Sequence, residues 1–180
     1  MTERKLPFLR GLLVAVVVCV LPLCLWWWFG CGPATTLLIV RHADRVGTQD
    51  ALKQPEGVVR AQELVHVVGT AGIVAIYRSD TNRSRDTAEP LATALGITPV
   101  VYPANNTAPL VNDIFADHRG EKVFVVGHSN TIPQIISAAG GPSIPNIADS
   151  VFDNLFVLTA CRCRHGLARL VNLKYGAVTP

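Results

Sequence analysis

The sequence predicts an α/β domain, a three-layer sandwich with a mostly parallel central sheet, together with an N-terminal transmembrane helix. Two observations lead to this prediction. From residue 36 onward, short apolar runs alternate with longer segments in which apolar residues recur at helical spacing; this pattern is typical of helices that cover both faces of a parallel sheet. Ahead of these runs, no charged residue occurs between positions 11 and 40.

The length and the charge of the chain limit what it can be. Its 180 residues suit one domain with a tail, and we divide them into a membrane anchor or signal segment, residues 1–33, and a domain, residues 34–180. The net charge is +3, but Arg4, Lys5 and Arg10 all lie in the first segment. The domain is therefore nearly neutral, which argues against nucleic acid as a partner.

Residues 11–29 have the length and composition of a membrane span. The run has no charge and no polar stripe, and about 20 apolar residues suffice to cross a bilayer core. The tryptophans at 26–28 lie at its far end, where aromatic rings prefer the headgroup level, and the basic residues before the run mark its near end as cytoplasmic. We therefore expect an uncleaved signal anchor, with the domain outside the cytoplasm in the periplasm or at the cell surface.

Three other interpretations of this segment stay open. A cleaved signal peptide would give a secreted domain, although Pro33 and the bulky residues 26–29 fit a cleavage region poorly. Cleavage and acylation at Gly30 and Cys31 would give a lipoprotein, which places the domain on the same side. A buried helix of a soluble domain is the third, and the missing polar stripe argues against it.

The elements of the domain are predicted in order from apolar patterning. Buried strands are expected at 36–40, 73–77, 98–102 and 122–126, with helices at 57–68, 81–95, 110–118 and 131–139. Ser79 and Asp80 offer a cap for the second helix, and Pro90 should kink or divide it. A loop at 142–150 leads to two closing strands at 154–159 and 168–173, which a hairpin could join.

Polar side chains gather at the carboxyl ends of the predicted strands. Arg41-His42-Ala43-Asp44-Arg45 follows the first strand, Arg78-Ser79-Asp80 with Arg83 follows the second, and Gly127-His128-Ser129-Asn130-Thr131 follows the fourth. Ligands of parallel sheets bind outside these strand ends, so the side chains should share a pocket. A neutral imidazole can attack phosphorus, and guanidinium groups match the oxygens of a phosphoryl group. The set predicts a phosphoryl-transfer site.

A metal site is the competing interpretation of the same residues. His42, Asp44 and His128 could ligate zinc, but Arg41 and Arg83 beside them would repel the cation. We therefore expect no metal and no cofactor. The spacing of Cys161 and Cys163 is not a zinc pattern either; we interpret the two as strand residues on one face, with a strained disulfide or a reactive pair as alternatives.

Four segments, in order, resemble motifs of the histidine phosphatase superfamily, which includes phosphoglycerate mutases, acid phosphatases and phosphohistidine phosphatases. They are Leu38-Ile-Val-Arg-His-Ala-Asp44, Glu56-Gly-Val-Val-Arg-Ala-Gln62, Tyr77-Arg-Ser-Asp-Thr-Asn-Arg-Ser-Arg-Asp-Thr-Ala88 and Val125-Val-Gly-His-Ser-Asn-Thr131. The resemblance covers residues 36–175, and the compact domain is most similar to the small phosphohistidine phosphatase branch. It implies a phosphoglycerate mutase-like fold.

The resemblance also implies a role for each site residue. His42 would be the phosphorylated nucleophile, Arg41 and Arg83 would hold the phosphoryl oxygens, and His128 would stabilise the transition state. Arg83 rather than Arg85 stands four residues before Thr-Ala, as the motif requires. Three residues beside these, Arg45, Ser129 and Asn130, are further candidates for binding substrate.

The proton donor is the part of the site that the motifs do not supply. Ser129 stands where acid phosphatases carry an aspartate, and Asp44 and Asp113 are the candidates for a general acid. We expect a phosphatase that hydrolyses a phosphate ester or phosphoramidate of a small substrate through phosphohistidine. The alternative is a membrane-anchored phosphate-binding module with little or no turnover. Loops 46–56, 103–109 and 141–153 would set the specificity.

Overall fold

The structure, a computed structural model, describes residues 33–161 and 168–179. Its elements are β1 (Thr35–Arg41), α2 (Glu56–Val68), β2 (Ile73–Ser79), α3 (Asn82–Leu95), β3 (Val100–Tyr102), α4 (Thr107–Asp117), β4 (Lys122–Gly127), α5 (Thr131–Ala138), β5 (Asn154–Ala160) and β6 (Arg169–Lys174). Each strand and helix that the apolar pattern predicts within these residues is present, with its ends shifted by a few residues. The α/β prediction is therefore confirmed.

The six strands form one mixed sheet in the order β3-β2-β4-β1-β5-β6. The four strands from β3 to β1 in that order are mutually parallel, as βαβ units require. The fifth strand, β5, is antiparallel to both β1 and β6, and β5 with β6 gives the predicted closing pair. Parallel pairing is thus confined to four of the six strands, which include the three strands that the polar motifs follow.

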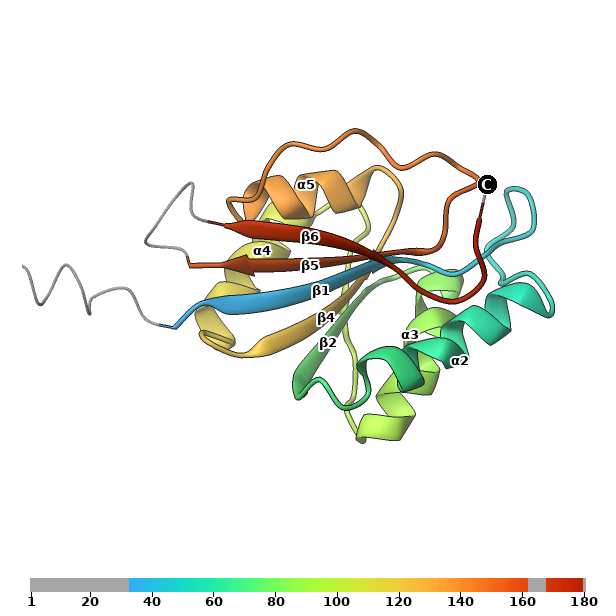
Figure 1. Ribbon diagram of the computed structural model, residues 1–180, viewed down its shortest axis with the longest axis horizontal. Helices are drawn as coiled ribbons and strands as arrows, with labels where there is room; N and C mark the ends of the chain where they lie inside the picture. Colours follow the sequence, from blue (N-terminus) through green and yellow to red (C-terminus); the bar gives the residue numbers. More distant parts are fainter. Residues whose placement is uncertain (1–32, 162–167, 180) are drawn as a thin grey trace, which may run out of the picture. The chain divides into compact units, whose positions relative to one another are not determined.

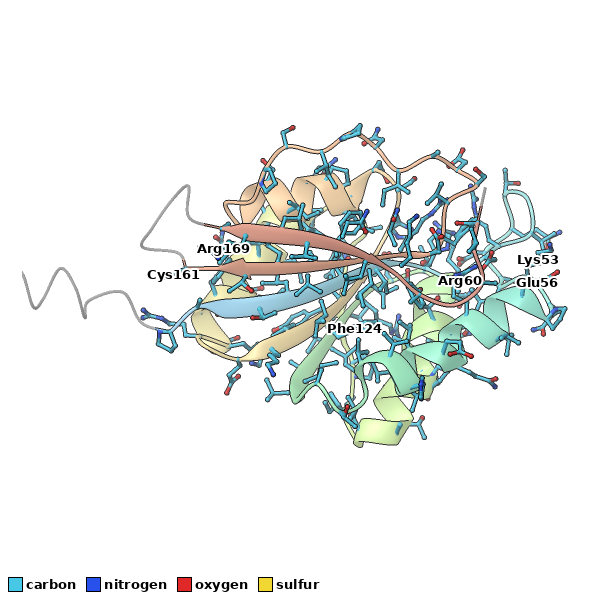
Figure 2. All side chains as sticks on the ribbon, in the orientation of Figure 1. Lys53, Glu56, Arg60, Phe124, Cys161 and Arg169 are labelled. Carbon is cyan, nitrogen blue, oxygen red and sulfur yellow. The ribbon has the colours of Figure 1, made fainter. Side chains whose placement is uncertain are left out.

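The helices lie on both faces of the sheet, as a three-layer sandwich requires. Figure 1 shows α2 and α3 on one side and α4 and α5 on the other. Alternate residues of β1 divide between the two cores: Leu37 and Ile39 pack toward α4 and α5, whereas Leu38 and Val40 pack toward α2 and α3. Phe124 of β4, fully buried at the centre of the sheet, belongs to the second core (Figure 2).

The helix α3 differs from the expectation at its start and at its proline. Its N-cap is Thr81, whose Oγ1 accepts a hydrogen bond from the backbone N–H of Ser84, so neither Ser79 nor Asp80 is the cap. Ser79 instead ends β2 and is fully buried. Pro90 does not divide the helix, which is continuous from Asn82 to Leu95. Packing of its buried face outweighs the one backbone donor that proline lacks.

The predicted membrane span, residues 11–29, lies outside the described residues, and so does Cys163. Within residues 33–161 and 168–179, no helix is long and apolar enough to cross a membrane. The division of the chain at residue 33, the anchor and the extracytoplasmic position of the domain therefore stay predictions.

Candidate active site

The carboxyl ends of β1 and β4 bring the two histidines of the motifs together. These strands are paired in parallel, with Arg41 opposite Gly127, so His42 and His128 follow at the same edge of the sheet. Their ring centroids are 5.3 Å apart. Because β2 lies on the other side of β4, the start of α3 and its Arg83 reach the same edge.

A cavity of about 360 Å³ opens at this edge. Its lining comprises Arg41, His42, Arg45, Arg83, Ala104, Asn105, His128, Ser129, Asn130, Thr131 and Gln134. All seven residues predicted to contact the phosphoryl group or the substrate are in this set. Ala104 and Asn105 come from the loop at 103–109, which was expected to contribute to specificity, whereas Gln134 on α5 was not anticipated because nothing local distinguishes it from a surface glutamine.

His42 is held as a neutral imidazole with one defined tautomer. Its side chain is 2% exposed, and burial lowers its pKa to about 3. The Nδ1 atom lies 2.9 Å from the carbonyl oxygen of Ala43. A carbonyl can only accept, so Nδ1 carries the proton and donates it to that bond. Nε2 therefore keeps its lone pair, as a nucleophile needs.

His128 has the opposite tautomer. Arg83 donates from Nη2 to His128 Nδ1 over 3.4 Å, and an arginine can only donate, so Nδ1 is the accepting nitrogen. Nε2 then carries the hydrogen and donates to Ser79 Oγ over 2.8 Å, and that hydroxyl donates onward to Ser84 Oγ over 2.7 Å. Burial lowers the pKa of His128 to about 4. In this state His128 orients the guanidinium of Arg83.

Arg41 is anchored by the loop at 148–151, through hydrogen bonds from Nη1 and an ion pair between Nη2 and Asp149 Oδ1 at 3.6 Å. Its Nη1 donates to the carbonyl oxygens of Ala148, Asp149 and Val151 at 2.9, 3.0 and 2.9 Å. The guanidinium carbon lies 4.1 Å from the ring centroid of Phe152, which supports the cation from one face. Burial lowers the pKa of Arg41 to about 10, which still leaves it charged at neutral pH. Its buried Nε has no hydrogen-bond partner within residues 33–161 and 168–179.

Arg83 is anchored in the same manner by a different acceptor. Its Nη1 donates to Asp50 Oδ1 over 2.9 Å, and the same carboxylate accepts from the backbone N–H groups of Asn82 and Arg83 at the start of α3. These hydrogen bonds keep the pKa of Asp50 below its ordinary value, although partial desolvation opposes them. The buried Nε of Arg83 also has no partner.

Three arginines of the cavity lining, Arg41, Arg45 and Arg83, point to an anionic ligand, because no carboxylate stands beside them among the described lining residues. A tetrahedral oxyanion in the cavity offers several acceptor oxygens, and guanidinium groups bind such oxygens in pairs. The cavity is thus complementary to a phosphoryl group, with the lone pair of His42 Nε2 beside it.

Solved structures share this architecture, although neither a protein-family model nor a curated protein matches the sequence. A mycobacterial glucosyl-3-phosphoglycerate phosphatase is similar with a TM-score of 0.60 and 15% identity, over 79% of this chain and 99% of that chain. The protein histidine phosphatase SixA in complex with tungstate gives 0.59 and 12%, over 77% and 96%. Phosphoglycerate mutase from Plasmodium falciparum gives 0.50 and 19%, over 82% and 94%.

The chain has the histidine phosphatase fold. These structural neighbours are members of the histidine phosphatase superfamily, and the expected phosphoglycerate mutase-like architecture is confirmed. Within this fold the four motifs fall at the positions that the sequence indicated: three at strand ends around the cavity, and the one that begins at Glu56 at the start of α2.

Neither candidate for the general acid lies in the lining of this cavity. Asp44 pairs with Arg60, with 2.6 Å between Asp44 Oδ2 and Arg60 Nε. Asp113 is exposed on α4. Arg85, which does not have the spacing from Thr-Ala that the motif requires, pairs with Asp86 on the surface of α3. Among the described residues, the lining contains no carboxylic acid.

Two residues that shape this site were not anticipated. Asp50 anchors Arg83, and Phe152 packs against both Arg41 and His42, its ring centroid lying 5.9 Å from that of His42. Both belong to loops, where neither periodicity nor a motif marks a functional side chain. The one sequence signal is that Phe152 is the single aromatic residue of the loop at 141–153.

Proposed function

We propose that the protein is a phosphatase that hydrolyses a small phosphorylated substrate through a phosphohistidine on His42. One observation carries the proposal above the others. The hydrogen bond from His42 Nδ1 to the carbonyl oxygen of Ala43 fixes the tautomer that leaves Nε2 free, and burial keeps the imidazole neutral, in a cavity that Arg41 and Arg83 also line. Support also comes from the phosphatases of the same fold, of which one was solved with tungstate and one with vanadate.

The reaction has two displacements at phosphorus. In the first, the lone pair of His42 Nε2 attacks, a P–N bond forms, and the bond to the leaving group breaks as that group takes the electron pair. Arg41 and Arg83 bind the equatorial oxygens, where negative charge is spread in the transition state. In the second, water attacks phosphorus, the P–N bond breaks, Nε2 regains its lone pair, and the water proton passes to solvent with release of inorganic phosphate.

The proposal is tested by trapping the intermediate. The full chain in detergent is mixed briefly with a labelled aryl phosphate and quenched in alkali, where phosphohistidine survives. We expect label that is lost on acid treatment and is absent in His42→Asn, while His118→Asn, a histidine outside the cavity, retains it. Turnover at an unchanged rate in His42→Asn would disprove the covalent role of His42.

A phosphate-binding module without turnover is the second candidate function. The described residues of the lining favour it, because they include no carboxylic acid and burial keeps both histidines neutral, which leaves no strong acid to protonate a poor leaving group. Tight vanadate binding together with no hydrolysis of any ester, anhydride or phosphoramidate would establish this function instead.

We also propose that residues 11–29 anchor the domain and that it works outside the cytoplasm. The charge-free apolar run and the basic residues before it support this arrangement. Protease added to intact cells or spheroplasts should digest the domain, while an N-terminal tag should be protected. Recovery of the domain in the medium, or acylation of Cys31, would indicate the secreted or the lipoprotein form.

A further inference from the structure

Arg60 is a buried cation outside the cavity that the proposed mechanism leaves without a role. It lies on α2, is 3% exposed, and all three of its nitrogen groups are engaged. Nε pairs with Asp44 Oδ2 over 2.6 Å, while Nη1 and Nη2 donate to the carbonyl oxygens of Tyr175 and Ala177 over 2.9 and 2.8 Å. Arg60 therefore ties the segment after β6 to the loop that carries His42 (Figure 2).

The link to His42 is short and stiff. Asp44 is two residues beyond His42, and its backbone carbonyl accepts from the N–H of Lys53 over 2.8 Å. Gly57 lies so close to that carbonyl that a Cβ there would collide with it. The Asp44 backbone is thus held by Lys53 and packed by Gly57, while its side chain is held by Arg60, so the turn from His42 to Asp44 has little freedom to move.

The same segment after β6 also supports the other flank of the cavity. The backbone N–H of Tyr175 donates to the carbonyl of Asp153 over 2.9 Å, and that of Thr179 to Asp153 Oδ2 over 3.3 Å. In return, Phe152 N–H donates to Thr179 Oγ1 over 3.1 Å. Phe152 is the residue whose ring packs against Arg41 and His42.

We propose that Arg60 and Thr179 are positioning residues of the active site, and that the segment at 175–179 connects them: Arg60 binds its carbonyl groups, and Thr179 belongs to it. Arg60 acts through Asp44 on His42, and Thr179 acts through Phe152 on Arg41. Neither lines the cavity. The inference rests on the proposed function, since it assigns these residues to the alignment of the nucleophile and of the phosphoryl clamp.

Stability alone is a poor reason for the buried Arg60–Asp44 pair. Removing two charges from water costs about as much as their attraction returns, and well-packed apolar residues often replace such pairs without loss of stability. An apolar pair cannot orient its neighbours through hydrogen bonds, whereas the planar guanidinium of Arg60 fixes the positions of one carboxylate and two carbonyl groups. A misplacement of about 1 Å at a reacting group can lower its rate about 100-fold.

The test uses the full chain and measures the effect of Arg60 on His42 separately from the effect of Thr179 on Arg41. Arg60→Met should lower the single-turnover rate of His42 phosphorylation by p-nitrophenyl phosphate about 10- to 100-fold, with vanadate affinity changed less than about threefold, because Arg41 and Arg83 keep their anchors. Thr179→Val should weaken vanadate binding about three- to tenfold, the loss of roughly one hydrogen bond, with the smaller effect on the saturated rate. Val67→Ser, at a residue of α2 that is 42% exposed and outside the cavity, is the control and should change neither.

If Arg60 and Thr179 had a merely structural role, the two variants would not differ in whether the phosphorylation rate or the vanadate affinity is lowered. A general loss of folded protein would reduce both readouts together, in proportion to the folded fraction measured by circular dichroism. If Arg60→Met does not fold, Arg60→Lys and Thr179→Val decide the question. Folded variants with the wild-type rate and the wild-type affinity would overturn the inference.

A readout without turnover distinguishes this inference from the proposed function. The ¹⁵N shifts of His42 report its tautomer, and Arg60→Met should increase the population that lacks the hydrogen bond to Ala43. If the wild-type chain forms no phosphoenzyme with any donor but the tautomer shifts as expected, the proposed function fails and the positioning stands. An unchanged tautomer together with unchanged vanadate affinity in both variants would exclude the positioning role, whatever the activity.

Discussion

His42 and Ala43 form the hydrogen bond that decides the chemistry of the site, from Nδ1 to the adjacent carbonyl oxygen over 2.9 Å. Because this bond occupies Nδ1, only Nε2 can attack phosphorus. We predict that the phosphoenzyme carries its phosphoryl group on Nε2 alone. Isomer-specific antibodies or ³¹P–¹H correlation spectra of the trapped intermediate would identify the nitrogen, and a phosphoryl group on Nδ1 would contradict the tautomer.

The two buried histidines should make the domain less stable in mild acid. In the folded state the pKa values of His42 and His128 are lowered to about 3 and about 4, against about 6.5 in the unfolded chain. Between these values the unfolded chain binds more protons, so the free energy of unfolding falls as pH falls below 6.5, by up to about 1.4 kcal/mol per pH unit for each histidine.

Urea unfolding at pH 7.5 and pH 5.0 checks this dependence. We expect a loss of up to about 4 kcal/mol from the two histidines together, and about half of it in His42→Asn. Asp50 and Asp153 also have lowered pKa values, but their stabilisation is lost only as pH falls below about 4. A free energy of unfolding that is equal at both pH values would show that the histidines are not held neutral by burial.

The central sheet and the members of the cavity could be predicted because both follow from local patterns. The run at 36–40 is apolar without alternation, as a strand buried on two faces must be, and Arg41 and His42 come directly after it. Once the strands are parallel, their polar ends have to meet. The antiparallel hairpin of β5 and β6 is equally local, since it joins neighbours in the sequence.

Anchoring of the arginines could not be predicted in the same way. The three carbonyl groups that hold Arg41 belong to the backbone of residues 148–151. Every residue type has such a group, so the sequence does not indicate which residues bind Arg41. Asp50 and Arg60 are ordinary charged residues until the fold brings them to Arg83 and Asp44. Long-range polar contacts of this kind depend on loop paths that no periodicity encodes.

Arg83 should be replaceable by lysine only at a cost in anion affinity. Lysine keeps the charge but loses the planar fork that reaches Asp50, His128 and the ligand together. Loss of one charge-assisted hydrogen bond corresponds to about 1.5–3 kcal/mol, so vanadate affinity should fall about 10- to 100-fold in Arg83→Lys. Arg85→Lys, two residues along the same helix, should bind vanadate as the wild type does; equal losses in both variants would place the clamp elsewhere.

Tyr175 offers a prediction about stability. Its hydroxyl is buried without a hydrogen-bond partner among the described residues, and burial raises its pKa. Tyr175→Phe removes that unsatisfied group and leaves the ring in place, so the free energy of unfolding should stay equal or rise by up to about 1 kcal/mol. A loss of more than about 1 kcal/mol in urea unfolding would show that the hydroxyl has an acceptor.

The part of the cavity lining that the structure describes has no carboxylic acid, which predicts a steep dependence on the leaving group. Burial keeps its two histidines neutral, so no strong acid faces the departing oxygen and the leaving group must accept the electron pair unaided. In a series of aryl phosphates, the rate of His42 phosphorylation should fall steadily as the pKa of the phenol rises, and phosphoramidates or anhydrides should react faster than alkyl esters. Asp113→Asn, at an exposed residue outside the cavity, should leave the series unchanged. If the rate did not depend on the phenol and alkyl esters reacted fast, the site would have to contain a proton donor. If the fast reaction of alkyl esters were then lost in Asp44→Asn, Asp44 would be that donor despite its pairing with Arg60.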